Sequence, residues 1–320
     1  MQFFIAANFL TVYCCNVAQT PRPGEIVMAS GLGIEPGGKG LNVAIGTSRL
    51  GAQVSALVGI GRDAAGDGLV SLLQSEGVGT DHVHRLSDTS GCGFGLIAQD
   101  GSNCGAVFAG PNLLLNAAHA ALARPAIESA HWVYGQFETA LPAVKACFEL
   151  ARAAGVPTML NPSPWQPIPA ELLGLTDVLL VNEVEAEQLL QNKVPAQTSL
   201  AQTAALLDAA VQALWSRWPG RWLVVTLGER GSLAWQRGEA PVLTPAWRVQ
   251  AVDTLGAGDA FASGLLFKLG QGRVLPDALA FASACGAIMA STPGVLGALP
   301  TEQAVSTFMA SKAAMLTPAS

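Results

Sequence analysis

Between Gly38 and about Leu299, short apolar runs alternate with longer stretches of helical spacing, and this alternation constrains the fold more than any other feature. The apolar runs are continuous, which is typical of parallel strands covered on both faces. The expected strands are residues 54–59, 131–135, 157–161, 177–182 and 221–228. The expected helices are residues 40–50, 65–76, 142–154, 183–191, 201–216, 257–269 and 276–291. Strands and helices in this order predict an α/β fold with a doubly wound, mostly parallel sheet flanked by helices.

Two glycine-rich segments interrupt the alternation. Residues 9–36 and 90–109 have strand character with no helix between their strands, so we expect them to form a small β-sheet lid. The apolar N-terminal segment lacks the basic start of a signal peptide, and it is shorter than the roughly 20 residues of a membrane helix. We therefore expect core strands there. The whole pattern predicts one domain over residues 1–312 and a C-terminal tail over residues 313–320.

Charge and cysteine content exclude several classes of protein. Charged residues make up 12% of the chain and the net charge is −6, whereas nucleic-acid binding needs a basic face. No cluster of Lys and Arg indicates an anionic membrane surface. The six cysteines lack metal-ligand spacing, and a chain of this length does not need disulfides. We therefore expect reduced thiols in a cytoplasmic protein.

The segment DTLGAGDAFASGLL (residues 253–266) predicts an anion site. Its three small residues, Gly256, Ala257 and Gly258, directly precede a helix, and backbone N–H groups at a glycine-rich helix start bind anions such as phosphate. Asp259 follows at once. An acid at a helix start can simply stabilise the helix. Beside a bound phosphate, however, its charge is unfavourable unless it takes part in the chemistry.

GGKGLN (residues 37–42) is a second candidate ligand site. Its glycines, Gly38 among them, allow a ligand to approach the backbone, and Lys39 and Asn42 offer groups suited to sugar hydroxyls. Residues 33–40 nearly match a nucleotide P-loop, but Gly40 stands where that motif needs a hydroxyl residue. Residues 59–64 resemble a dinucleotide fingerprint, but the acid that should follow is misplaced. Neither of these two motifs predicts a nucleotide site.

Both glycine motifs resemble those of the ribokinase-like (PfkB) sugar and nucleoside kinases. LNPSPW (residues 160–165), VNEVEAEQL (181–189) and VTLGERGS (225–232) lie between them and resemble the internal landmarks of that family, in order. The resemblance extends from about residue 5 to residue 305. It implies a kinase that uses ATP and Mg²⁺.

The resemblance implies roles for residues on the ATP side of the site. Asp259 would be the general base, and the amides of Gly256, Ala257 and Gly258 would hold the transferred phosphoryl group. Asn182 and Glu185 match an N-x-x-E motif that organises Mg²⁺, often through water. The implied nucleotide-binding residues are Asn182, Thr226, Gly228 and Ser283.

Many members of this family are activated by a monovalent cation bound beside the anion site. The resemblance implies such a site for K⁺, with Asp253 and the carbonyl group of Leu255 as ligands. Further carbonyl ligands would come from Met289, Thr292 and Gly294.

The acceptor pocket departs from the family pattern. An alignment on AANFLT places Thr11 where these kinases usually have a sugar-binding Asp, with Asn8 and Leu10 close by. Glu138 retains a second sugar-facing position, and Asn112 is a further candidate for the same cleft. With Gly38, Lys39 and Asn42, these residues still indicate a polyol pocket, although loss of a bidentate acceptor should change which substrate binds.

The implied function is ATP-dependent phosphorylation of a hydroxymethyl group of a small sugar. Three alternatives remain open: a nucleoside kinase, a kinase of phosphosugars, and a sugar or nucleotide sensor without turnover. The first would use Phe9, Trp132 or Trp165 to stack a base. We also expect the lid to close over the acceptor, and a homodimer formed through the lid because an exposed apolar sheet face needs a cover.

Overall fold

The computed structural model of the protein describes residues 1–100 and 102–316. Its main sheet has ten strands in the order β14-β13-β12-β11-β10-β9-β1-β4-β5, with β6 paired to β4. They are β1 (Gln2–Ala6), β4 (Gln53–Gly61), β5 (Val78–Gly79), β6 (Val83–Ser87), β9 (Trp132–Gln136), β10 (Thr158–Asn161), β11 (Val178–Asn182), β12 (Trp222–Thr226), β13 (Gly231–Gln236) and β14 (Val242–Pro245). All pairs are parallel except β12–β13 and β13–β14. The predicted doubly wound, mostly parallel sheet is confirmed.

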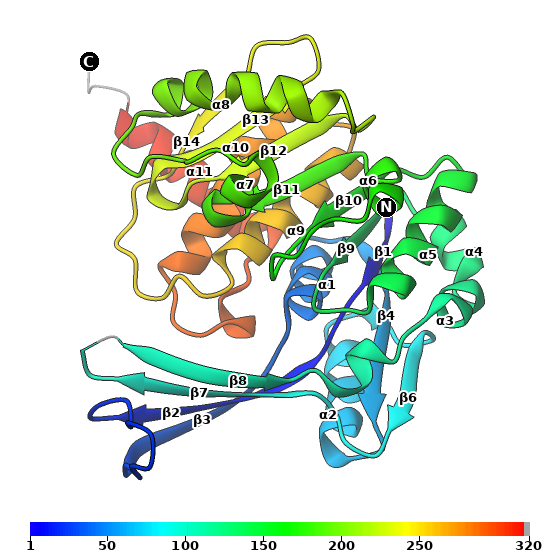
Figure 1. Cartoon of the computed structure of the whole chain (residues 1–320), viewed down its shortest axis with the longest axis vertical. Coiled ribbons are helices and arrows are strands. Elements are labelled where there is room, and N and C mark those ends of the chain that lie inside the picture. Colours follow the sequence, from blue (N-terminus) through cyan, green and yellow to red (C-terminus); the bar gives the residue numbers. More distant parts are fainter. Residues whose placement is uncertain (101, 317–320) are drawn as a thin grey trace.

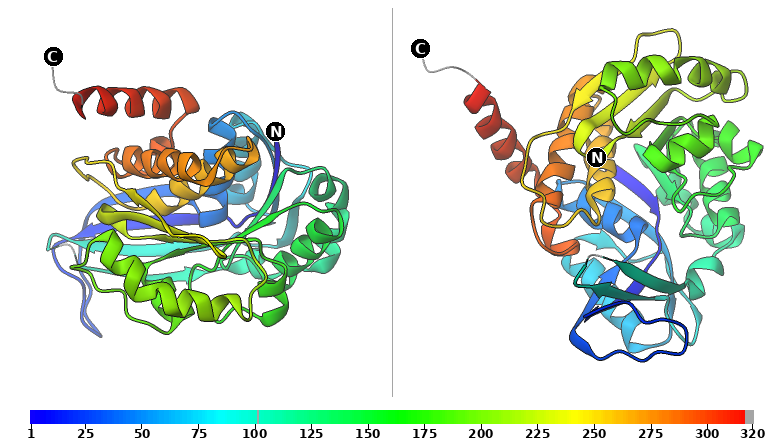
Figure 2. Two further views of the ribbon diagram at one scale, coloured as in Figure 1. Left: turned by 90° about the horizontal axis from the view of Figure 1, so that it is seen from above. Right: turned by 60° about the vertical axis from the view of Figure 1, so that its left-hand side comes forward.

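Helices cover both faces of this sheet (Figures 1 and 2). One face packs against α1 (Lys39–Arg49), α2 (Ala64–Ser75), α9 (Ala257–Gly270) and α10 (Leu275–Ala290). The other packs against α3 (Ala117–Leu122), α4 (Arg124–Glu128), α5 (Leu141–Ala153), α6 (Ala170–Gly174), α7 (Glu183–Leu190) and α8 (Leu200–Trp215). Short 3₁₀ turns η1 (Gly110–Leu113), η2 (Gly228–Arg230) and η3 (Leu296–Ala298) complete the body, and α11 (Glu302–Leu316) lies outside α10.

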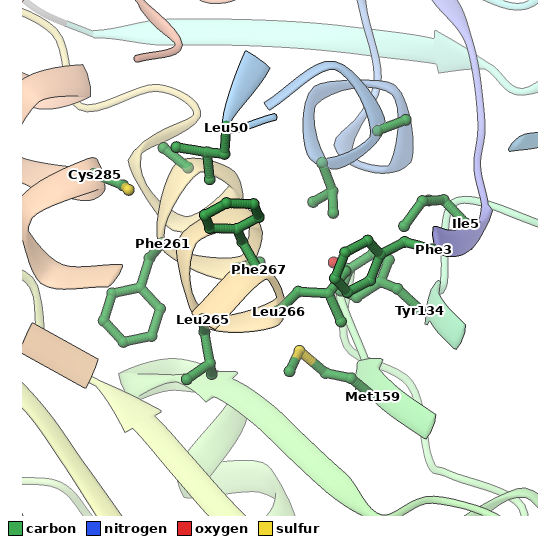
Figure 3. Packing of buried hydrophobic residues seen from close by; sticks show 14 of the residues in the cluster. Phe3, Ile5, Leu50, Tyr134, Met159, Phe261, Leu265, Leu266, Phe267 and Cys285 are labelled. Carbon is green, nitrogen blue, oxygen red and sulfur yellow. The ribbon is translucent and has the colours of Figure 1, made fainter. Parts of the chain in front are cut away.

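Alternation along β1 divides its side chains between two hydrophobic cores. Phe3 and Ile5 lie in the core beneath α1 and α9, whereas Phe4 and Ala6 lie in the core beneath α5. Figure 3 shows Phe3 beside Leu266 of α9. The apolar N-terminal segment therefore forms a core strand, as the sequence predicted, and the strand that follows it, β2, belongs to the second sheet.

A second sheet projects from the body as the predicted lid (Figure 1). Its strands are β2 (Leu10–Val17), β3 (Ala29–Gly37), β7 (Cys92–Ala98) and β8 (Asn103–Phe108), in the order β3-β2-β7-β8. The connection from β1 to β2 and the one that follows β8 are held together by the side chain of Asn112. It accepts from the N–H of Phe9 at 2.9 Å and donates to the carbonyl of Phe9 at 2.8 Å. Residue 101, within the predicted lid, lies outside the described residues.

Some elements differ from expectation. The antiparallel strands β13 and β14 extend the sheet where the sequence predicted neither. Helix α11 continues to Leu316, so the tail predicted over residues 313–320 begins as helix; residues 317–320 lie outside the described part. Within residues 1–100 and 102–316, no helix is both long and apolar enough to cross a bilayer.

Candidate active site

The first turns of α1 and α9 meet at the candidate active site, although they are distant in sequence. Asn42 of α1 donates a hydrogen bond from Nδ2 to Oδ2 of Asp259 in α9, at 2.7 Å. Both side chains are buried, with Asp259 only 6% exposed. The other amide atom of Asn42, Oδ1, is buried and has no partner among the described residues. A buried acceptor without a donor is costly, so this atom fits the hydroxyl group of a ligand.

Burial raises the pKa of Asp259 to about 6. The charge of Lys39 and the hydrogen bond from Asn42 oppose the rise, while the charges of Glu138 and Glu185 add to it. A carboxylate with this pKa is still ionised at neutral pH, yet it is a much better proton acceptor than an exposed aspartate. Asp259 therefore has the properties of a general base.

The glycine turn before α9 is shaped for an anion. Gly256 has a φ of 77°, and a Cβ atom there would lie 2.7 Å from the Met289 methyl and 3.1 Å from Cγ1 of Val295. A Cβ on Gly258, by contrast, would meet nothing within 4 Å, so the space beside it is open. No side chain caps α9. Its first N–H groups are thus available to a ligand, apart from that of Ala257, which bonds the carbonyl of Thr254 at 3.2 Å.

Glu138, which follows β9, connects the end of β1 with the start of α1. Its Oε2 accepts hydrogen bonds from Nδ2 of Asn8 at 2.8 Å and from the backbone N–H of Lys39 at 2.9 Å. Asn8 also accepts a bond from the N–H of Gly40 through Oδ1, at 2.9 Å. A Cβ on Gly38 would clash with Asn8 at 2.6 Å, which explains the glycine there. The predicted residues Gly38, Lys39 and Glu138 are therefore brought together.

Thr11 does not join this group. Its N–H bonds the carbonyl of Gly91 within the lid, and strand alternation turns its side chain to the opposite face from Leu10. Leu10 lies two residues after Asn8 and packs at Gly91. The sugar-binding role of Thr11 stays a prediction, and Asn8 is the polar residue after the first strand that contacts Glu138.

Asn112 is fully buried, and its amide already serves the backbone. Besides its two bonds to Phe9, Nδ2 donates to the carbonyl of Ala109 at 2.7 Å. A direct contact with a substrate would require a change in these bonds. The structure therefore gives Asn112 a part in joining the lid to the body.

Asn182 and Glu185 form a capping box at the start of α7. Oδ1 of Asn182 accepts from the N–H of Glu185 at 2.8 Å, and Oε2 of Glu185 accepts from the N–H of Asn182 at 2.9 Å. The N-x-x-E motif thus has a structural role. No hydrogen bond in the described chain uses Oε1 of Glu185, a residue only 3% exposed. One free carboxylate oxygen fits Mg²⁺, which keeps several of its waters.

The predicted nucleotide residues lie on three different elements. Thr226 ends β12, and Gly228, with a φ of 56°, begins η2 two residues later. Ser283 is buried within α10, the helix that packs against α9. The nucleotide-binding roles of these three residues stay predictions.

The predicted cation residues surround the glycine turn. Oδ1 of Asp253 accepts a hydrogen bond from the N–H of Leu255 at 2.9 Å. The Met289 methyl packs at Gly256, while its carbonyl accepts from the N–H of Thr292 at 3.2 Å. Gly294, the remaining predicted ligand, turns the chain with a φ of 83°. Two segments that lie beside the turn thus carry all five residues.

Two aromatic residues offered for base stacking are core residues. Phe9 is 2% exposed and Trp132 is 6% exposed, and both pack in the core beneath α1. A base-stacking role is therefore wrong for these two, and only Trp165 is left from that argument. Tyr134 is marked by no motif in the sequence, yet its buried hydroxyl has no partner among the described residues. Burial raises its pKa well above the usual value, and the carboxylates of Asp259, Glu185 and Glu138 add to this effect.

Comparison with known proteins supports one family. The family model described as pfkB family carbohydrate kinase matches residues 10–302. A ribokinase from Haemophilus influenzae is 30% identical over 296 residues, covering 92% of this chain and 94% of the relative.

Solved structures agree with this relationship. A Cryptococcus neoformans ribokinase in complex with ADP has a TM-score of 0.81 at 27% identity and covers 96% of this chain and 98% of its own. An Arabidopsis thaliana ribokinase complexed with ribose and ATP has a TM-score of 0.88 at 24% identity, with 96% and 98% covered. The chain belongs to the pfkB family of carbohydrate kinases, as its motifs predicted.

Proposed function

We propose that this ATP-dependent sugar kinase phosphorylates a hydroxymethyl group of a small sugar, with Asp259 as the general base. The observation that carries the proposal is the buried pair of Asp259 and Asn42, joined at 2.7 Å beside an uncapped glycine turn. This arrangement puts a proton acceptor next to an anion site. A kinase needs both where the acceptor hydroxyl meets ATP.

In the proposed reaction, the acceptor hydroxyl oxygen attacks the γ-phosphorus of ATP. The bond between this phosphorus and the oxygen bridging to the β-phosphate breaks, ADP leaves, and the hydroxyl proton passes to Asp259. The free N–H groups at the start of α9 stabilise the charge on the transferring phosphoryl group. A positioned base contributes roughly 10²- to 10⁴-fold in rate, so the remaining acceleration comes from orientation and charge stabilisation.

Glu185 would hold Mg²⁺ through water with its free Oε1. When bound, the metal ion would neutralise part of the phosphate charge. We also propose that Asp253, Leu255, Met289, Thr292 and Gly294 bind a K⁺ ion next to the glycine turn. Their position beside Gly256 supports this, because a cation there would add to the positive electrostatic potential that the turn offers to a phosphoryl group.

On the acceptor side, we propose that the sugar lies between Asn42, Lys39 and Glu138. Oδ1 of Asn42 lacks a donor, and no hydrogen bond in the described chain uses Oε1 of Glu138. Each of these oxygens can accept from a sugar hydroxyl. Glu138→Gln should therefore raise KM for the sugar about tenfold or more with a smaller change in kcat.

The lid supports a homodimer. Strand alternation gathers apolar side chains on one face, which we call the outer lid face: Tyr13, Leu32, Ile34, Phe94 and Phe108. Four of these five are more than half exposed, and the rings of Tyr13 and Phe94 stack at 5.3 Å. A second copy would cover this apolar surface and pair the two lids.

The test is ADP release with Mg²⁺-ATP and K⁺ against pentoses, hexoses, sugar phosphates and nucleosides. The proposal expects turnover on a free sugar. Turnover on a nucleoside or a phosphosugar alone would show that the proposed acceptor, a free sugar, is wrong. ATP binding without turnover on any member of the panel would favour a sensor without catalytic activity. Assays without K⁺ test the monovalent cation, and assays with EDTA, which chelates Mg²⁺, test the divalent one.

A further inference from the structure

Arg49, in the last turn of α1, holds three elements together far from the acceptor. Its guanidinium forms a two-pronged ion pair with Glu76 at the end of α2, with Nη2–Oε1 at 2.6 Å and Nε–Oε2 at 2.8 Å. Its Nη1 donates to the carbonyls of Leu296 and Leu299, at 2.5 and 3.2 Å. The side chains of Arg49 and Glu76 are only 24% and 18% exposed, so this cluster is largely shielded from water.

Arg49 binds the carbonyls of Leu296, the first residue of η3, and of Leu299, which directly follows η3. Val295 directly precedes η3. Val295 is one of the two side chains that pack at Gly256 in the glycine turn, where its Cγ1 would lie 3.1 Å from an added Cβ. Residues 295–299 therefore begin with a side chain that packs against the turn and continue with two carbonyls fixed by Arg49. Movement of η3 would displace Val295 from Gly256.

We infer that Arg49 is a positioning residue for phosphoryl transfer: it fixes η3 and, through Val295, the glycine turn that receives the phosphate. This inference rests on the proposed function of the turn. Helix α1 carries Asn42 at one end and Arg49 at the other, so a single rigid element positions both the general base and the anion site. Arg49 touches neither substrate and acts only through other residues.

The chemistry of the guanidinium group fits this task. Arginine presents its donors in a planar fork, so one side of the group pairs with a carboxylate while another donor reaches carbonyls. A lysine ammonium keeps the charge but is a point donor that cannot satisfy Glu76 and both carbonyls together. Arg49→Lys should therefore keep the ion pair and loosen η3, whereas Arg49→Met removes both interactions.

The experiment compares Arg49→Lys and Arg49→Met with Lys268→Met. Lys268 is a matched control because it is a shielded cation of α9, 15% exposed, that pairs with Glu302 at the far end from Gly256. We expect Arg49→Met to lower kcat about 10- to 100-fold with KM for the sugar within about twofold, because small displacements of reacting groups cost rate. Arg49→Lys should fall between it and the unchanged protein, and Lys268→Met should lose thermal stability without losing kcat.

Hydrogen exchange provides a readout other than activity. Arg49→Met should speed exchange of the amides in residues 254–259 and 295–299, and Lys268→Met should leave both segments unchanged. Equal kcat losses in Arg49→Met and Lys268→Met at matched loss of stability would overturn the inference, as would unchanged exchange at residues 254–259. If Gly256 and Asp259 variants retain full turnover, the proposed function itself fails; if they do not and Arg49→Met is fully active, only the inference fails.

Discussion

The starts of α1 and α9 and the outer lid face are built in opposite ways. At the helix starts, polar groups are buried and bonded to each other, as in the 2.7 Å contact between Asn42 and Asp259. On the lid, apolar side chains such as Phe94 and Ile34 are 54% and 56% exposed. A buried polar network fixes geometry before substrate arrives, whereas an exposed apolar sheet needs a partner. We therefore expect changes at the helix starts to affect kcat and changes in the lid to affect KM and assembly.

Short of removing the proposed base itself, the largest effect should follow from Gly256→Ala. The added methyl meets Met289 and Val295, and the φ of 77° is unfavourable for alanine, so the turn must shift. We expect kcat to fall about 100-fold or more, as for removal of an anion-hole donor. Gly272→Ala, just after α9, is the matched control, because Gly272 has a similar φ of 71° and its methyl would meet nothing within 4 Å. Equal losses in both variants would show that the shape of the turn at Gly256 has no special role.

The pH dependence should report the buried base. The pKa of Asp259 is about 6, and only its ionised form accepts a proton. Below this pH, kcat/KM should therefore fall about tenfold per pH unit, and above it should level off. The measurement is a pH profile at saturating ATP. A profile flat to pH 5 would show that no group with this pKa controls the reaction.

Phe94→Asp should change assembly and the sugar KM much more than it changes kcat. A charge on the outer lid face opposes burial against a second copy, so we expect monomers by light scattering. The sugar KM should rise about tenfold because the lid orders less well, with kcat changed only a few-fold. Leu206→Asp, at an equally exposed apolar residue of α8, should change neither quantity. If the protein without any substitution is already a monomer, the expected role of the outer lid face in assembly is wrong.

The smallest effect should be on stability. Burial raises the pKa of Asp259 to about 6. The free energy of unfolding therefore falls as the pH rises from the pKa of this group in the unfolded chain to about 6, and it is constant above that pH. Asp259→Asn should therefore raise the free energy of unfolding by about 2 kcal/mol at pH 8 and by less at pH 5. Thermal melts at both pH values check the sign. A lower melting temperature at pH 8 would mean that the carboxylate stabilises the fold.

Local signals made much of the molecule predictable from sequence. Continuous apolar runs identified the central parallel strands, and the glycine motifs identified the start of α9. Asn182 and Glu185 are three residues apart, so their capping box was readable as a pattern. The antiparallel strands β13 and β14 were missed, since their pairing partners are set by the edge of the sheet.

Long-range geometry could not be predicted in the same way. Asn42 and Asp259 are 217 residues apart, and their contact depends on how α1 packs against α9. The role of Thr11 stays a prediction, because one residue of register reverses the face to which a strand side chain points and the sequence does not fix that register. Asn8 carried no motif, and only the fold reveals that its amide bonds Glu138 and Gly40.

The most direct test of the account is ADP release by Asp259→Asn on the sugar that the unchanged protein accepts. Asp277→Asn serves as control, because Asp277 is an exposed acid in the first turn of the neighbouring helix α10. We predict that Asp259→Asn loses at least about 10³-fold in kcat while it still binds ATP, and that Asp277→Asn keeps full activity. Turnover by Asp259→Asn within about tenfold of the unchanged protein would contradict the claim that this buried carboxylate is the base.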